Sequence, residues 1–121
     1  MASAFAEQTS AIIGTFEGNF PTDRKTEKRF LEITITEKTS KIFLSGSAGY
    51  SSGRSAVPDF SGTGFPTKTH PFKFTFEDSF GNSGIAVISK TKSGVRFSVE
   101  IKDVQDTRCL PLYVESDLKR K

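Results

Sequence analysis

Few residues in this chain of 121 could perform catalysis, because it has one histidine, His70, and one cysteine, Cys109. General acid–base and nucleophilic catalysis need a positioned histidine, a reactive cysteine or paired carboxylates. His70 stands between Thr69 and Pro71, and nothing in the sequence supplies a catalytic partner for it. The sequence therefore predicts a protein without enzymatic activity.

The adjacent carboxylates Glu77 and Asp78 lie in a predicted strand, where neighbouring side chains point to opposite faces and cannot share a substrate. A zinc site would have to combine Cys109 with His70 and carboxylates, so we expect no metal and no cofactor. The chain also lacks a phosphate-binding loop and a dinucleotide fingerprint. As the sole cysteine, Cys109 cannot form an intramolecular disulfide and is expected to be a small buried hydrophobic residue.

Three segments alternate apolar and polar residues with a period of two, which is typical of strands with one buried face. They are residues 29–37 (RFLEITITE), 72–78 (FKFTFED) and 94–102 (GVRFSVEIK). In the second segment Phe72, Phe74 and Phe76 share one face. Weaker strand candidates are Ala11–Phe16, Lys41–Leu44, Asp59–Phe65, Gly84–Ser89 and Leu112–Leu118.

These strands predict one all-β domain covering residues 1–121, of which residues 1–8 are expected to be disordered or a remnant of a signal or vector sequence. About eight short strands separated by turn sequences favour a small antiparallel barrel of the lipocalin or meander type, with a two-sheet sandwich as the alternative. The chain has 12 phenylalanines, two tyrosines and no tryptophan. A closed sheet hides this much ring area better than an open one, so we expect the rings to fill the barrel.

Charge and composition exclude few partners, because the net charge is only +3 and both signs are mixed along most of the chain. The basic runs at residues 23–29 and 118–121 are interpreted as solvated surface. No apolar run approaches the roughly 20 residues that span a bilayer. Ala4-Phe5-Ala6 has the small-x-small form of a signal-peptidase site, which predicts a periplasmic or secreted protein.

The segment of residues 45–54, SGSAGYSSGR, is too polar for a core and too long for a tight hairpin turn. It is predicted to be a strand end that runs into a projecting loop, and loops on a rigid sheet often carry binding residues. Tyr50 and Arg54 are side chains of the kinds enriched in interface hot spots. The predicted partner-binding residues are Ser45, Ser47, Tyr50, Ser51 and Arg54.

The same segment carries a resemblance to a known family. SGSAGY at Ser45–Tyr50 resembles the Ser-Gly-x-x-Tyr loop of the periplasmic bacterial inhibitors of lysozyme, which are small secreted β-barrels. The match covers Ser45, Gly46 and Tyr50, with one extra residue before Tyr50 and without the paired cysteines common in that family. FEDSFGNSGIAVI and LPLYVESDLKRK also resemble segments of small exported proteins of Gram-negative bacteria.

The resemblance implies that the loop enters the active-site cleft of a lysozyme-like hydrolase, where Arg54 would pair with a carboxylate. The sequence thus predicts an exported binding domain whose expected partner is another protein. Two alternatives stay open at this point. One is a lipocalin-like carrier of a small apolar ligand, and the other is a barrel that binds nucleic acid. Nucleic acid is not expected, because the aromatic residues and the lysines fall on opposite faces of the predicted strands.

Overall fold

The computed structural model describes residues 11–66 and 71–121, so the Ala4-Phe5-Ala6 motif, residues 1–8 and His70 lie outside the described residues. The elements in chain order are β1 (Gly14–Pro21), β2 (Lys28–Lys38), β3 (Lys41–Tyr50), β4 (Asp59–Gly64), β5 (Phe72–Asp78), β6 (Ser83–Lys90), β7 (Gly94–Asp103), the 3-10 helix η1 (Thr107–Tyr113) and β8 (Ser116–Arg120). No helix in the described part of the chain has the length and apolar character needed to cross a membrane.

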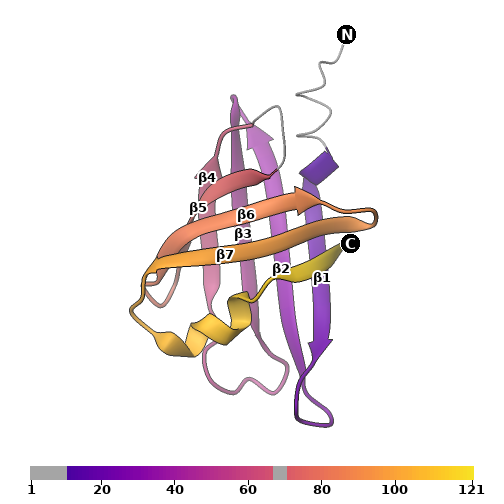
Figure 1. Ribbon diagram of the computed structural model, residues 1–121, viewed down its shortest axis with the longest axis vertical. Helices are drawn as coiled ribbons and strands as arrows, with labels where there is room; N and C mark the ends of the chain where they lie inside the picture. Colours follow the sequence, from indigo (N-terminus) through magenta and orange to yellow (C-terminus); the bar gives the residue numbers. More distant parts are fainter. Residues whose placement is uncertain (1–10, 67–70) are drawn as a thin grey trace.

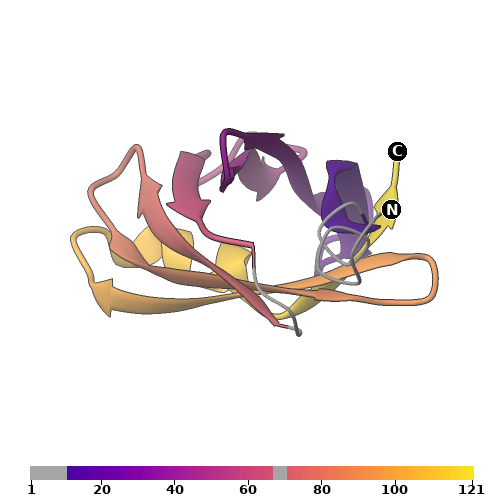
Figure 2. The same cartoon turned by 90° about the horizontal axis from the view of Figure 1, so that it is seen from above.

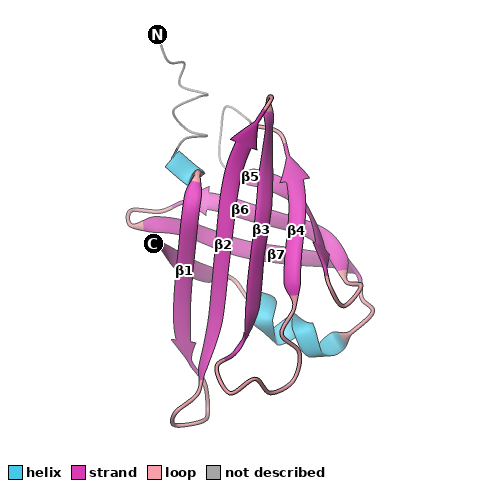
Figure 3. Ribbon diagram, turned by 180° about the vertical axis from the view of Figure 1, so that it is seen from behind, coloured by secondary structure: helices cyan, strands magenta, loops and turns pink. Residues whose placement is uncertain are grey.

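The eight strands form a closed antiparallel barrel in which each strand pairs with the next and β8 returns to β1. Strands β1 to β4 run side by side along the long axis (Figure 3), and β6 and β7 cross them on the other side of the core (Figure 1). Viewed from above, the strands surround a single centre (Figure 2). This topology confirms the predicted all-β barrel and replaces the two-sheet alternative.

Phenylalanine side chains occupy the inside of the barrel. Phe72, Phe74 and Phe76 are at most 2% exposed, as their alternation with polar residues predicts. Phe16 and Phe97 are fully buried with them. Each buried ring contributes about 1.5–3 kcal/mol relative to an exposed one, so these rings are a large part of what stabilises the closed sheet.

The β5–β6 turn is joined to η1 through the buried carboxylate of Asp78. Its Oδ2 accepts hydrogen bonds from the Tyr113 hydroxyl at 2.6 Å and from Asn82 Nδ2 at 2.9 Å. Asn82 Oδ1 in turn accepts from the backbone N–H groups of Gln105 and Asp106. Burial alone would raise the pKa of Asp78, but the hydrogen bonds from Tyr113 and Asn82 outweigh it and lower that pKa. Asp78 is therefore an ionised structural residue.

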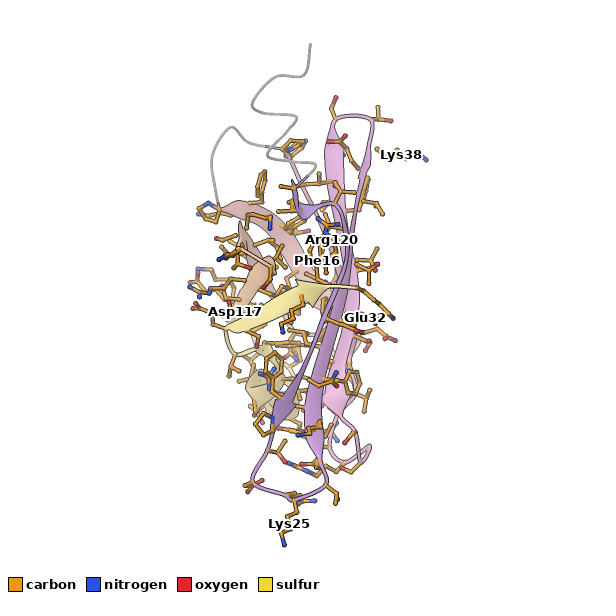
Figure 4. The ribbon with its side chains drawn as sticks, turned by 90° about the vertical axis from the view of Figure 1, so that its right-hand side faces the viewer. Phe16, Lys25, Glu32, Lys38, Asp117 and Arg120 are labelled. Carbon is orange, nitrogen blue, oxygen red and sulfur yellow. The ribbon has the colours of Figure 1, made fainter. Side chains whose placement is uncertain are left out.

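The barrel closes through a short contact between β1 and β8. Figure 4 shows β8 crossing β1 beside the labelled residues Phe16 and Arg120, and the two strands share two residue pairs. The Arg120 guanidinium donates to the carbonyl oxygens of Ile13 at 2.7 Å and Ala11 at 3.0 Å. It also lies 4.7 Å from the centre of the Phe16 ring. One side chain thus reinforces a closure that has few backbone hydrogen bonds.

The first and the last strand begin later than predicted. The first strand begins at Gly14, because residues 11–12 are helical. The last strand covers Ser116–Arg120, whereas Leu112 belongs to η1. η1 starts where the Asp106 side chain accepts a hydrogen bond from the Arg108 N–H group, a capping interaction that a search for alternation does not detect.

Candidate functional site

The predicted partner-binding residues divide into two groups. Ser45 and Ser47 lie within β3, which was predicted as Lys41–Leu44 but continues to Tyr50, so the predicted projecting loop begins only at Ser51. Their side chains point away from the core, because the inward positions of β3 are the buried Leu44 and Ala48 that alternate with them. Tyr50, Ser51 and Arg54 lie together where β3 ends.

The second half of β3 has the small, polar residues typical of a loop, because aromatic rings from the neighbouring strands fill the space beside it. A side chain at Gly46 would overlap the ring of Phe60, its pairing partner on β4. A side chain at Gly49 would crowd the ring of Phe30, its partner on β2. Small residues in this strand make room for rings from both sides, which no reading of β3 alone can detect.

The candidate site lies at the lower end of the barrel, which we define as the β1–β2 loop (residues 22–27) and the β3–β4 loop (residues 51–58), both at the bottom of Figure 1. The two loops are joined by Glu27, whose side chain is 3% exposed. Arg54 donates from Nε to Glu27 Oε2 at 2.6 Å and from Nη2 to Oε1 at 2.8 Å. The hydroxyls of Ser52 and Thr22 donate to the same carboxylate at 2.5 and 3.0 Å.

We call these four residues, Thr22, Glu27, Ser52 and Arg54, the Glu27 clip. The bidentate bond from Arg54, supported by Ser52 and Thr22, lowers the pKa of Glu27 from its ordinary value of 4.5 to about 2, although burial opposes this shift. The hydrogen bonding between Arg54 and Glu27 also raises the pKa of Arg54. The ion pair is therefore fully formed at neutral pH.

Tyr50 and Arg54 also contact each other directly. The Arg54 guanidinium lies 3.9 Å from the centre of the Tyr50 ring, a cation–π geometry that fixes the side chain further. Arg54 is 32% exposed, so one face remains in contact with solvent. In the sequence-based prediction Arg54 was free to pair with a carboxylate of a partner, whereas here it is engaged by Glu27.

The backbone of the β3–β4 loop is held by hydrogen bonds at its first residues. The Ser51 N–H donates to the Lys28 carbonyl at 2.8 Å, and the Ser51 hydroxyl accepts from the Lys28 N–H at 2.9 Å. The Gly53 N–H donates to the Tyr50 carbonyl at 2.8 Å, and Gly53 has φ +77°, which glycine adopts without strain. These hydrogen bonds hold the start of the loop against β2 and close a turn between Tyr50 and Gly53. Further along the same loop, Ala56 is buried.

The solvent-facing part of this loop is small and mostly polar. Ser51, Ser52, Gly53 and Ser55 are exposed, and Val57 is 44% exposed beside them. This surface offers hydroxyls and an aliphatic side chain on a fixed backbone, which suits contact with another surface.

The other residues weighed in the sequence for catalysis or metal binding are placed as follows. No group of three His, Cys, Asp or Glu side chains among residues 11–66 and 71–121 is placed to hold a metal ion. Glu77 is exposed and Asp78 is buried, which confirms that they point to opposite faces. Cys109 is buried as predicted, and burial raises the pKa of its thiol to about 11.

The sequence-based prediction missed Glu27 and its partners Thr22 and Ser52. Glu27 lies in the charged run of residues 23–29, which was interpreted as solvated surface. Its separation of 27 residues from Arg54 carries no periodic signal. Only the pairing of β2 with β3 brings the two loops together.

Comparisons with protein-family models, with curated proteins and with solved structures found no match to this chain. The structure establishes the general architecture of a small eight-stranded antiparallel barrel, and the comparisons assign the chain to no family.

Proposed function

We propose that this domain is a non-enzymatic binding protein that contacts a protein partner through the β3–β4 loop. The observation that carries the proposal is the Glu27 clip, which holds an exposed loop in one conformation by hydrogen bonds to a buried carboxylate. A loop that is already ordered loses less conformational entropy on binding, so more of its contact energy appears as affinity.

In this proposal Ser51, Ser52 and Ser55 supply hydrogen-bonding groups at the surface, and Val57 supplies the apolar contact. Arg54 acts mainly by positioning the loop, and its outer face adds positive charge. The rings that occupy the barrel favour a protein partner over a small apolar ligand, because they fill the space in which a carrier would hold its ligand.

The sharpest form of the proposal is an exported inhibitor of a lysozyme-like cell-wall hydrolase, the target that the SGSAGY resemblance implies. A lysozyme-treated suspension of bacterial cell walls loses turbidity, and the wild-type domain is expected to slow that loss. Val57→Glu should weaken the protection by about tenfold or more, as charge insertion at an interface contact does. Glu27→Gln should weaken it too, by releasing the loop.

Val104→Glu is the matched control, because Val104 is 43% exposed but follows β7, outside the candidate site. It should protect as well as wild type. An absence of protection at micromolar excess of the domain would contradict hydrolase inhibition. Equal weakening by both valine variants would contradict the assignment of the loop.

A further inference from the structure

Phe65 is the most exposed large hydrophobic residue in the described part of the chain, with 66% of its surface accessible. It follows the end of β4, at the opposite end of the barrel from the Glu27 clip. We propose that Phe65 and the lysines beside it form a second docking surface, for an acidic segment of a partner protein that carries an apolar side chain. This surface does not depend on the proposed role of the β3–β4 loop.

Two hollows flank the Phe65 ring. The first hollow has a volume of about 280 Å³ and lies over strands β4, β5 and β6. Besides Phe65, it is lined by Thr63, Gly64, Lys73, Phe74, Thr75 and Ile85. This volume is smaller than the roughly 300–1,000 Å³ of pockets that enclose whole small-molecule ligands. The hollow therefore suits a single apolar side chain.

The second hollow, of about 330 Å³, is formed by Glu37, Ser40, Phe65 and Pro66. The ring therefore stands as a ridge between two depressions. A partner chain that crosses the ridge would bury the ring and seat a side chain in the first hollow. An aromatic anchor in contact on both sides is the usual form of an interface hot spot.

The lysines around Phe65 determine the charge of the expected partner. Lys41 Nζ lies 5.8 Å from the centre of the Phe65 ring, and Lys73 lines the first hollow. Neither lysine has a carboxylate within 4 Å among residues 11–66 and 71–121, although Lys73 acts at longer range on Glu100, whose pKa is lowered mainly by Lys102 and also by Lys73. Lys38, at the upper tip labelled in Figure 4, is a third exposed cation at this end. Carboxylates of a partner would complete these pairs.

The same charges argue against other occupants. A second copy of this chain would bring Lys41 and Lys73 of one molecule towards those of the other, which is repulsive. A nucleic acid would find one exposed ring here, whereas single-strand binding uses several stacked rings. An anionic membrane would also favour several apolar residues over one ridge between two hollows.

A labelled ten-residue peptide with a central leucine flanked by aspartate and glutamate serves as the probe. It is titrated into ¹⁵N-labelled full-length protein, in parallel with the same peptide carrying lysines, a ten-nucleotide thymidine strand, and phosphatidylserine vesicles. The acidic peptide is expected to shift the amide signals of Phe65, Lys73 and Ile85, and to bind less tightly as salt is raised.

Phe65→Ser should weaken this binding by about tenfold or more, and the double variant Lys41→Glu with Lys73→Glu should weaken it similarly. Val114→Ser is the matched control, since Val114 is 50% exposed and follows η1. Its binding should equal that of wild type. An absence of binding at millimolar peptide, signal changes confined to other strands, or tighter binding of the nucleotide strand or the vesicles would each overturn the proposal.

Discussion

Glu27 is the charged residue on which the order of the candidate site depends most. Its carboxylate is buried, and it accepts four hydrogen bonds from three side chains. Removing the charge would leave the Arg54 guanidinium without its carboxylate partner and would weaken the link between the two loops. The stability of the lower end of the barrel therefore depends on whether the Glu27 carboxyl group is ionised.

This link predicts an acid dependence whose sign follows from the lowered pKa. Since the pKa of Glu27 is about 2 in the folded chain and 4.5 ordinarily, the clip stabilises the fold fully above about pH 4.5. That stabilisation is lost as the pH falls from there towards 2. In Glu27→Gln the melting temperature should be lower at pH 7, and the difference from wild type should shrink as the pH approaches 2.

Thermal unfolding followed by circular dichroism between pH 7 and pH 2 measures this difference. Other carboxylates titrate in the same range, so the comparison is made with Glu37→Gln, an exposed residue at the end of β2. Its melting curve should follow that of wild type throughout. A constant difference between wild type and Glu27→Gln from pH 7 to pH 2 would contradict the role of the Glu27 charge.

For individual residues, the sequence predicted which side chains are buried better than it predicted which polar side chains contact each other. Alternation identified Phe72, Phe74 and Phe76 as core, because burial on one face of a strand repeats every second residue. The bond between Glu27 and Arg54 has no such repeat. Tyr50 and Arg54 were named as important side chains, but their contact with each other and with Glu27 depends on how two loops approach.

Strands β4 and β5 can pack closely because position 62 on β4 is a glycine. A Cβ atom at Gly62 would lie 1.6 Å from the Thr75 carbonyl oxygen on β5, which is impossible without moving a strand. Beside it, the Thr63 N–H donates to the Thr75 hydroxyl at 2.9 Å, and the β4–β5 register skips residues 62 and 63. The barrel therefore turns sharply between β4 and β5, and glycine is required for space at this turn.

Gly62→Ala is accordingly expected to destabilise the fold by about 3 kcal/mol or more, because backbone has to shift to accept the methyl group. Gly53→Ala is the control, since no atom lies within 4 Å of its added Cβ and only its φ of +77° is unfavourable. That variant should lose about 1 kcal/mol. Urea unfolding measures both, and an equal loss in the two variants would contradict the packing argument.

The strands that alternate strongly, β2, β5 and β7, were predicted within one or two residues of their observed bounds. β3 was predicted only as Lys41–Leu44, although it extends to Tyr50. Its second half lacks large side chains because Phe60 and Phe30 from adjacent strands cover Gly46 and Gly49. A pattern within one strand cannot show what its neighbours contribute.

The whole molecule presents its two proposed binding surfaces at opposite ends. β3 runs from Lys41, near Phe65, to Tyr50, beside the Glu27 clip. A strand of this length spans about 30 Å, so partners at the two ends need not compete. The closed barrel with its core of rings holds these ends at a fixed separation.

The central claim is that the β3–β4 loop is held in one conformation by the Glu27 clip before any partner binds. Amide hydrogen exchange followed by NMR reports directly on the Ser51 and Gly53 N–H groups, which bond to the Lys28 and Tyr50 carbonyls. We predict that both exchange far more slowly than in an unstructured peptide. In Arg54→Met both should exchange faster while the amides of β3 keep their protection. Exchange of Ser51 and Gly53 in the wild-type protein at the rate of an unstructured peptide would contradict the account.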